Sequence, residues 1–238
     1  MNISVIIPAF NEEKRISSCL KSIANQTYKP MEIIVVDNNS TDKTAQIAKE
    51  FGARVIIEKQ QGITYARNYG FDNAKGEILA RTDADTLVPS NWLERINDHF
   101  EKDKKLDAVS GPAIFGLRFF TPIVRLLVFE ANRRIFGHYG LYGPNFAITK
   151  SVWEKVKDEV CLDNARVHED TDLAIHIGKV GKIGYDSKLK VKTSARRLRQ
   201  SPTSLLVMYL IKWADMIALH KKYRISTFAS NIKHKITN

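Results

Sequence analysis

The chain has 238 residues, of which 44% are hydrophobic, and a net charge of +11. This length supplies one sizeable core, and no Pro/Gly/Ser-rich stretch marks a linker, so we expect one domain at residues 1–200 with an appendage at 201–238. Two cysteines, Cys19 and Cys161, lie far apart without metal-ligand or disulfide spacing. This spacing excludes a disulfide framework, favours a reducing compartment and predicts that both cysteines are packing residues.

The positive charge is concentrated near the C-terminus. Residues 186–238 contain 12 Lys/Arg against 2 Asp/Glu, which leaves a net charge of only about +1 for the rest of the chain. A basic block of this kind attracts polyanions, such as anionic lipid headgroups, nucleic acid or a phosphorylated substrate. The alternative is a solvated face that only promotes solubility.

The N-terminal ten residues, MNISVIIPAF, contain an apolar run that ends at Pro8 and has no basic leader before it. This pattern predicts a buried strand at residues 3–7 and not a signal peptide, so we do not expect export.

The first 110 residues alternate short apolar runs with amphipathic runs of helix length. Strands are predicted at residues 3–7, 32–36, 54–57 and 78–82, and helices at 12–25, 42–51 and 64–74. Thr41 is the predicted cap of the second helix, and Gly52 is predicted to end it in the left-handed conformation. Such alternation is typical of an α/β fold with a mostly parallel sheet, whose ligands bind beyond the carboxyl ends of the strands.

Two amphipathic, basic segments follow, at residues 119–136 and 204–223. The second has only seven successive apolar residues, 205–211, before Lys212, far fewer than the roughly 20 that a bilayer-spanning helix requires. Both segments are expected either in the plane of a membrane interface or as ordinary core or oligomer helices. The adjoining basic residues favour the membrane.

Two carboxylates follow the strand at 78–82, in the triplet Asp83-Ala84-Asp85. Carboxylates one residue apart at a strand end can share Mg²⁺ or Mn²⁺, because such ions bind one or two carboxylates and keep positions open for phosphate oxygens. Taken alone the triplet is a weak signal, since Asp is common in turns.

Three further motifs accompany this triplet in a fixed order. They are Pro8-Ala9-Phe10-Asn11-Glu12-Glu13, Val35-Val36-Asp37-Asn38-Asn39-Ser40-Thr41-Asp42 and Ala66-Arg67-Asn68-Tyr69-Gly70. With these motifs, residues 3–186 closely resemble the family 2 glycosyltransferases. The resemblance implies a GT-A fold, which is Rossmann-like with a mixed, mostly parallel sheet flanked by helices. It also implies an inverting, metal-assisted transfer from a UDP- or GDP-sugar with Mg²⁺ or Mn²⁺.

The resemblance also assigns the residues of the donor site. They are Pro8, Ala9, Phe10, Glu12, Asp37, Asn39, Arg67, Asp83, Ala84 and Asp85, with Asp83 and Asp85 as metal ligands. An ionised Asp37 at a strand end can accept hydrogen bonds from a base or ribose, and the Arg67 guanidinium can bind phosphate oxygens. The alternatives are a turn or helix cap for Asp37 and a surface helix position for Arg67.

A second acidic motif, His168-Glu169-Asp170-Thr171-Asp172-Leu173, matches the family's Glu-Asp core. The resemblance implies that Asp170 is the catalytic base and Glu169 a supporting carboxylate, because an acceptor hydroxyl must lose its proton. An ionised phosphate acceptor would remove that need. Both acids could instead only interact favourably with the N-terminal dipole of a helix that extends to His176. His168 is expected to be a neighbour and not a ligand, since no second His or Cys stands at metal spacing.

Two later segments complete the predicted site. The run Tyr142-Gly143-Pro144-Asn145-Phe146-Ala147 occupies the place of the family's small-residue loop beside the donor sugar, although a plain turn explains it equally well. Arg196 and Arg197 follow a predicted strand at 189–191 and are hypothesised to contact the leaving diphosphate.

The chain also departs from the family's processive members, since it lacks their Gln-x-x-Arg-Trp motif and transmembrane helices. We therefore expect a non-processive enzyme that is cytoplasmic and peripheral on the inner face of the cell membrane, with a glycan or lipid-linked acceptor. Alternatives are a sugar-nucleotide pyrophosphorylase, whose Gly-rich phosphate loop is missing, and an inactive glycan- or lipid-binding module of the same fold. Nucleic-acid binding is not expected, because no motif beyond charge supports it.

Overall fold

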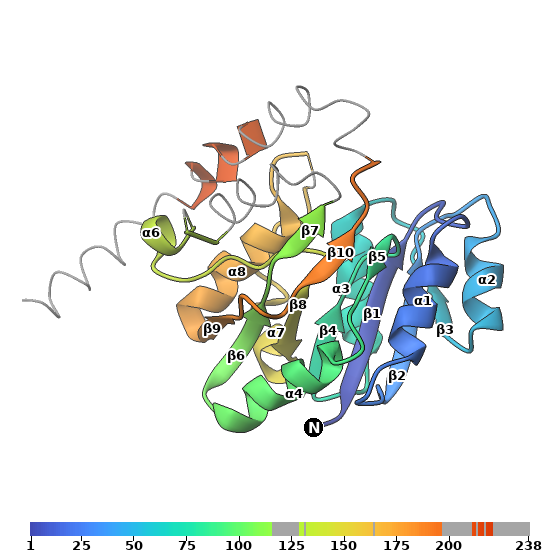
Figure 1. The fold of residues 1–238 in the computed structure, drawn as a ribbon. Coiled ribbons are helices and arrows are strands. Elements are labelled where there is room, and N and C mark those ends of the chain that lie inside the picture. The colour runs from blue at the N-terminus through green and yellow to red at the C-terminus, as the bar shows by residue number, and fades with distance from the viewer. Residues whose placement is uncertain are drawn as a thin grey trace, which may run out of the picture.

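The computed structural model describes residues 1–115, 129–130, 132–163, 165–196, 211–212, 214–216 and 218–220. A central sheet of seven strands, in the order β3-β2-β1-β4-β8-β6-β9, has helices on both faces (Figure 1). A smaller sheet, in the order β5-β10-β7, lies beside it. The predicted α/β class with a mixed, mostly parallel sheet is confirmed.

The large sheet combines parallel and antiparallel pairs. Strands β3, β2, β1 and β4 are parallel, β8 is antiparallel to both β4 and β6, and β9 is parallel to β6. Its members are β1 (Ile3–Ala9), β2 (Glu32–Asp37), β3 (Arg54–Ile57), β4 (Ile78–Arg81), β6 (Leu106–Ser110), β8 (Phe146–Thr149) and β9 (Lys182–Tyr185). The small sheet contains β5 (Thr86–Leu87), β7 (Ala113–Phe115) and β10 (Val191–Thr193).

Alternation along β1 divides the core into two clusters. Val5 and Ile7 pack in the cluster formed with α1, α2 and α4, whereas Ile6 packs in the cluster with α3, α7 and α8. The helices are α1 (Ile16–Ala24), α2 (Thr44–Glu50), α3 (Ile63–Asn73), α4 (Trp92–Lys102), α6 (Asn132–Phe136), α7 (Lys150–Val156) and α8 (Glu169–Val180). Because successive strand residues point to opposite faces, one strand supplies both clusters.

The predicted elements differ from the observed ones mainly at their ends. Gly52 has a φ of 76°, so its predicted left-handed conformation is confirmed. The predicted cap Thr41 is wrong. Helix α2 begins at Thr44, whose backbone N donates to Asp42 Oδ1 at 2.9 Å, while the N of Thr41 donates to Asn11 Oδ1. Several adjacent polar residues can each bond the exposed amides of a helix start, so sequence alone does not select among them.

The predicted strand at 189–191 is shifted along the chain. The observed strand β10 begins at Val191 and continues to Thr193, because it pairs with β7 on one side and β5 on the other. Residues Lys192 and Thr193, predicted to follow the strand, therefore lie within it.

The two amphipathic segments fall mostly outside the described residues. Described parts are α6 and residues 129–130 of the first, and short pieces within residues 211–220 of the second, where Met216 and His220 are buried. Among the described residues no helix is both long enough and apolar enough to cross a membrane. Cys19 is fully buried on α1, as expected of a packing residue, whereas Cys161 is only partly buried.

Candidate functional site

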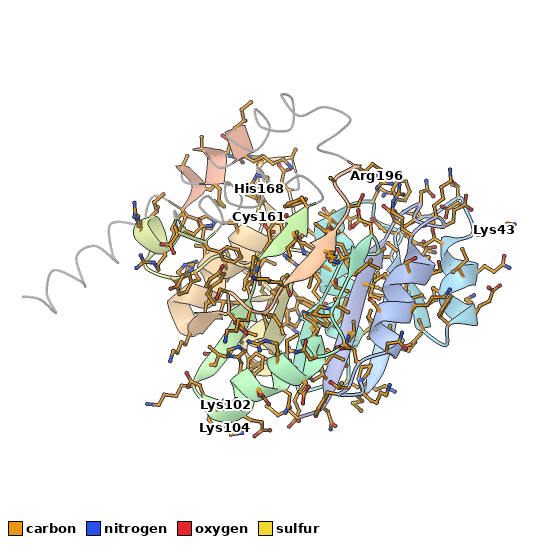
Figure 2. All side chains as sticks on the ribbon, viewed as in Figure 1. Lys43, Lys102, Lys104, Cys161, His168 and Arg196 are labelled. Carbon is orange, nitrogen blue, oxygen red and sulfur yellow. The ribbon has the colours of Figure 1, made fainter. Side chains whose placement is uncertain are left out.

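The predicted site residues gather where the parallel strands end. Strands β1, β2 and β4 are neighbours, with Ala9 opposite Asp37 and Ile6 opposite Arg81, so their carboxyl ends meet at one edge of the sheet. Asp37 is the last residue of β2; it is buried, and its Oδ1 accepts from Ser40 N at 3.2 Å. In Figure 2, Arg196 and His168 lie toward this edge, opposite the end that carries Lys102 and Lys104.

The turn after β1 contains both buried and exposed members of the predicted donor site. Pro8 and Ala9 are buried, whereas Phe10 is 48% exposed. Glu12 N donates to Thr44 Oγ1 at 2.8 Å, and its carboxylate forms an ion pair of 2.6 Å with Arg196 Nη2. The structure thus joins two predicted site residues that lie 184 positions apart in the sequence.

Glu169 lies between two buried arginines. Its Oε1 accepts from Arg81 Nη1 and its Oε2 from Arg67 Nη1, which also donates to the Glu169 carbonyl at 2.7 Å. Arg67 is completely buried, and Arg81 is only 2% exposed. Arg67, predicted to contact the diphosphate, therefore contacts the acidic motif from the interior. The sequence alone does not predict this contact between Arg67 and Glu169.

These pairs fix the charge of Glu169. Burial opposes its ionisation, but the charges of Arg81 and Arg67 and their hydrogen bonds hold the pKa of Glu169 below its ordinary value. Burial lowers the pKa of Arg67, whereas the carboxylates around Arg81 outweigh burial and raise the pKa of Arg81. Glu169 is therefore an ionised partner that orients its neighbours, and not a group that exchanges protons near neutral pH.

Arg81 also reaches the aspartate triplet. Its Nη2 lies 3.1 Å from Asp83 Oδ1, so one side chain at the end of β4 connects the two acidic motifs. Sequence reasoning missed Arg81. The signal was present, because an arginine that ends an apolar strand needs a buried partner.

Asp170 lies beside this network. Gly143 N donates to its Oδ2 at 2.8 Å, and a Cβ on Gly143 would be 3.2 Å from Arg81 Nη2, so the absence of a side chain permits this close approach. Burial, followed by the negative charge of Glu169, raises the pKa of Asp170. A carboxylate with a raised pKa accepts a proton more readily at neutral pH than an ordinary aspartate does.

The aspartate triplet presents oxygen atoms between the two sheets. Asp83 has a side chain 34% exposed, and Ala84 between the acids is buried. Asp85 is half-buried, with its Oδ1 3.4 Å from Thr193 Oγ1 on β10, which in turn contacts Thr86 of β5. A donor set made only of oxygen atoms suits Mg²⁺ or Mn²⁺, so these residues fit the predicted cation.

The small-residue loop at 142–147 is fixed from three sides. Thr82 Oγ1 donates to Pro144 O at 3.0 Å, and Trp92 Nε1 donates to Asn145 Oδ1 at 2.8 Å. Asn145 Nδ2 donates to Leu189 O at 2.6 Å. The loop is therefore held, with Gly143 beside Asp170, by bonds to the residue after β4, to α4 and to the segment before β10.

Two predicted residues stand apart from this cluster. Asn39 is exposed in the left-handed conformation, with a φ of 66°, and its Nδ2 donates to Lys59 O at 2.8 Å. Arg197 lies outside the described residues.

The chain is similar to proteins of known family. Residues 4–157 match the family model described as Glycosyl transferase family 2. Among curated proteins, the chain is 37% identical over 200 residues to "Glycosyltransferase GlyA" of Streptococcus pneumoniae; this covers 77% of the chain and 27% of that protein. Across three such relatives the matched region spans 27% to 38% of their length.

Solved structures share the fold. The mannosyltransferase PcManGT from Pyrobaculum calidifontis, in complex with GDP-Man and Mn²⁺, has a TM-score of 0.69 at 22% identity, covering 91% of this chain and 64% of that one. Glucosyl-3-phosphoglycerate synthase from Mycobacterium tuberculosis, in complex with Mn²⁺, UDP and phosphoglyceric acid, has a TM-score of 0.66 at 20% identity, covering 91% and 78%. The predicted GT-A fold is confirmed by these likenesses.

Proposed function

We propose that this chain, which belongs to glycosyl transferase family 2, transfers one sugar from a UDP- or GDP-sugar to an acceptor, with inversion at the anomeric carbon. One observation carries the proposal: Arg81 bonds both Asp83 and Glu169, which joins the two acidic motifs at the edge where the parallel strands end. Ligands of such sheets bind at that edge.

The donor's nucleoside would lie over the ends of β1 and β2. There the Asp37 carboxylate is placed to accept hydrogen bonds from base or ribose, and the exposed ring of Phe10 offers an apolar face. The Arg196 guanidinium, held by Glu12, supplies positive charge near the same turn. This positive charge would stabilise the negative charge that develops on the diphosphate as it leaves.

Asp83 and Asp85 would hold the divalent cation, which when bound supplies positive charge to the diphosphate oxygens. Arg81 orients Asp83 from the interior, and Thr193 approaches Asp85 from β10. These contacts keep the two carboxylates in place before the donor arrives, which limits the reorganisation needed during the reaction.

Asp170 is proposed as the base. The acceptor oxygen forms a bond to the anomeric carbon from the side opposite the diphosphate, and the bond to the diphosphate breaks with its electron pair. The acceptor proton goes to Asp170, which Gly143 N and the start of α8 hold in position. Glu169 and Arg67 are positioning residues, because they act through Arg81 and the backbone of α8.

The curated relatives do not identify the acceptor or the cellular setting of this chain, because the chain matches only part of their length. We propose a glycan or lipid-linked acceptor at an anionic membrane on its cytoplasmic side. Residues 1–200 are proposed as the catalytic unit, and 201–238 as an appendage that contacts the lipid. The family match disfavours a pyrophosphorylase; an inactive binding module is tested below.

The test is donor hydrolysis, since transferases slowly transfer sugar to water. A panel of UDP- and GDP-sugars with Mn²⁺ or Mg²⁺ is expected to release one nucleotide, and chelation of the metal or Asp85→Asn should abolish the release. Asp170→Asn should lower turnover by roughly 10²–10⁴-fold, the usual contribution of a positioned base. NMR of the first sugar product should show inverted anomeric configuration.

Asp98→Asn is the matched control. Asp98 is an exposed carboxylate on α4 that pairs with Lys102, so its loss should leave turnover unchanged. Absence of nucleotide release from every donor would favour the inactive module. Release that is indifferent to chelator and to Asp85→Asn would reject the metal site.

A further inference from the structure

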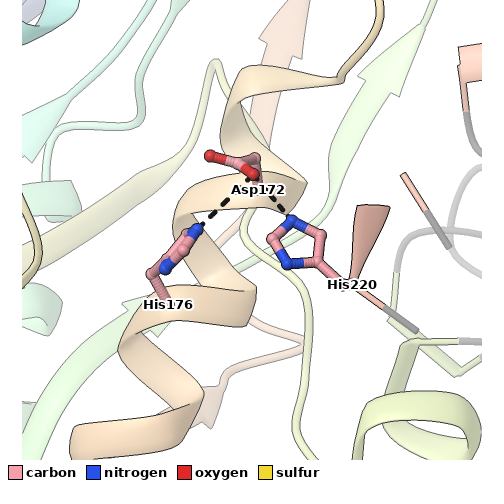
Figure 3. A group of neighbouring side chains, drawn as sticks. All are labelled: Asp172, His176 and His220. Carbon is pink, nitrogen blue, oxygen red and sulfur yellow. Dashed lines mark hydrogen bonds and ion pairs between the residues drawn. The ribbon is translucent and has the colours of Figure 1, made fainter. Parts of the chain in front are cut away.

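A second group of ligating side chains lies behind the acidic motif, on α8. Asp172 and His176 stand one helical turn apart, and His220 comes from the C-terminal part of the chain. All three are buried, with exposures of 0%, 5% and 6%. Figure 3 shows dashed lines from the Asp172 carboxylate to both imidazole rings. The proposed transfer reaction uses none of these three side chains.

We propose that Asp172, His176 and His220 bind one Zn²⁺ ion, which fastens residues 218–220 to α8. One ligand atom from each residue lies within 4.8 Å of the other two. Tetrahedral zinc, with bonds of about 2.0–2.2 Å, places neighbouring ligand atoms about 3.3 Å apart. The Asp172 Oδ1 atom is 2.9 Å from His220 Nε2 and 3.7 Å from His176 Nε2, values that bracket this spacing.

The neighbouring groups orient both helix ligands for this role. His176 Nδ1 lies 3.1 Å from Glu159 Oε2, and a ring that donates from Nδ1 to a carboxylate keeps Nε2 for a metal. Lys179 Nζ, which can only donate, is 2.9 Å from the same Nδ1 and 3.6 Å from Glu159 Oε2. Binding of a metal at Nε2 would therefore require this ammonium to turn from Nδ1 to the Glu159 carboxylate. Asp172 Oδ2 accepts from Cys161 N at 2.8 Å, which turns Oδ1 toward the two rings.

The chemistry of the donors selects zinc over the cation proposed at Asp83 and Asp85. Two imidazoles and one carboxylate suit Zn²⁺, whereas oxygen-only sites suit Mg²⁺ or Mn²⁺. Burial opposes ionisation of Asp172, but hydrogen bonds with His176 and His220 hold its pKa below the ordinary value, so it is an anionic ligand. Three protein ligands leave the fourth tetrahedral position for water.

The consequence is mechanical. The first turn of α8 carries Glu169 and Asp170 together with the ligand Asp172, and the ligand His176 follows one turn later on the same helix. A bound ion would join this helix to a residue 44 positions beyond its His176 ligand, which restrains the C-terminal segment against the helix that bears the proposed base.

The experiment uses the full chain without a polyhistidine tag. Zn²⁺ is titrated by calorimetry, and zinc retained after gel filtration is measured by mass spectrometry. The expected result is one Zn²⁺ per chain, with binding weakened by more than roughly 100-fold in both His176→Gln and His220→Gln, because loss of a ligand costs more than the 10–100-fold typical of losing a ligand's hydrogen-bond partner. The double variant Asp83→Asn/Asp85→Asn should keep this binding, so failure of the donor-site proposal is distinguishable from failure of this one.

His99→Gln removes an imidazole on α4 outside the cluster and should bind Zn²⁺ like the unaltered chain. Co²⁺ added to the unaltered chain should give the strong visible absorption of a tetrahedral site, which needs no variant to fold. The proposal is overturned if the unaltered chain binds neither ion, or if both histidine variants, folded by circular dichroism, bind as before. Either result would mean that the trio is only a hydrogen-bonded contact.

Discussion

Arg81 shows how much one buried side chain determines in this site. It ends β4, and its guanidinium contacts Asp83 and Glu169 while lying over the ring of Phe146 at 5.6 Å. A buried cation of this kind is held only because carboxylates surround it. The two acidic motifs therefore share one counter-ion, and a change at either motif is expected to affect the other.

We predict that Arg81→Met lowers the free energy of unfolding by roughly 3–5 kcal/mol, because it leaves Glu169 buried with one partner fewer. In an Arg81→Met/Glu169→Gln double variant the loss should be smaller than the sum of the single losses, since a neutral amide costs less to bury than a carboxylate. Urea unfolding measures both effects. Arg133→Met, in an exposed ion pair with Glu130, is the control and should cost less than about 1 kcal/mol. Additive losses would contradict this account.

At the scale of the elements, the sequence predicts the N-terminal half well because its signals are local. Strand β3 was predicted with its observed ends, and the four parallel strands follow from apolar runs between helices. Contacts between elements carry no such signal. Gly70, for instance, lets α3 approach the sheet so closely that a Cβ there would lie 2.5 Å from Ile6 Cγ2. The sequence showed only a glycine within a helix.

The candidate site follows the same division. The two acidic motifs could be found from residue types and order, because each occupies a short stretch of chain. The bond from Arg196 to Glu12 and the contact of His220 with Asp172 could not, because the partners lie 184 and 48 positions apart in the sequence. Such pairs depend on how the layers pack, and a single sequence does not record that.

Asp186 connects the end of β9 to α4, and the stability that this contact provides should depend on pH. It follows β9 and is bonded by Arg95 and His99 of α4. Burial opposes its ionisation, but these bonds lower the pKa of Asp186 from 3.8 to about 2. Because the folded-state pKa is depressed, the stabilisation is complete above about pH 4 and is lost as the pH falls toward 2.

We predict that Asp186→Asn lowers the free energy of unfolding by roughly 2 kcal/mol at pH 7, the value that this pKa difference implies. The difference in free energy of unfolding between the unaltered chain and the Asp186→Asn variant should narrow below pH 4 and approach zero near pH 2. Urea unfolding at a series of pH values measures it. A difference that stays constant across this range would show that Asp186 acts through packing and not through its charge.

At the scale of the whole molecule, the positive charge is concentrated in the C-terminal residues, and one of these residues, Arg196, lies at the proposed donor site. The proposed donor site lies at one edge of the sheet, and Arg196 lies at the same end of the molecule in Figure 2. Most of the net charge of +11 comes from residues 186–238, of which Arg196 is a member. If this basic part of the chain rests on an anionic membrane, the site is held close to the lipid surface, where a lipid-linked acceptor would be found.

This arrangement predicts binding of the full chain to vesicles that contain phosphatidylserine, with weaker binding as salt is added and none to phosphatidylcholine alone. Replacing Lys221, Lys222 and Arg224 with Gln should weaken the binding by about 100-fold, since each basic residue near such a surface contributes about 1 kcal/mol.

The matched control replaces three exposed lysines of the N-terminal half, at positions 21, 49 and 75, which removes the same charge and should leave binding unchanged. Vesicle co-sedimentation measures the lipid binding of both triple variants. Retention of the unaltered chain on a duplex DNA of equal charge density is measured for comparison. Equal weakening by both triple variants would show that net charge, and not its placement near the C-terminus, governs the attraction; tighter retention on the DNA would overturn the preference for lipid.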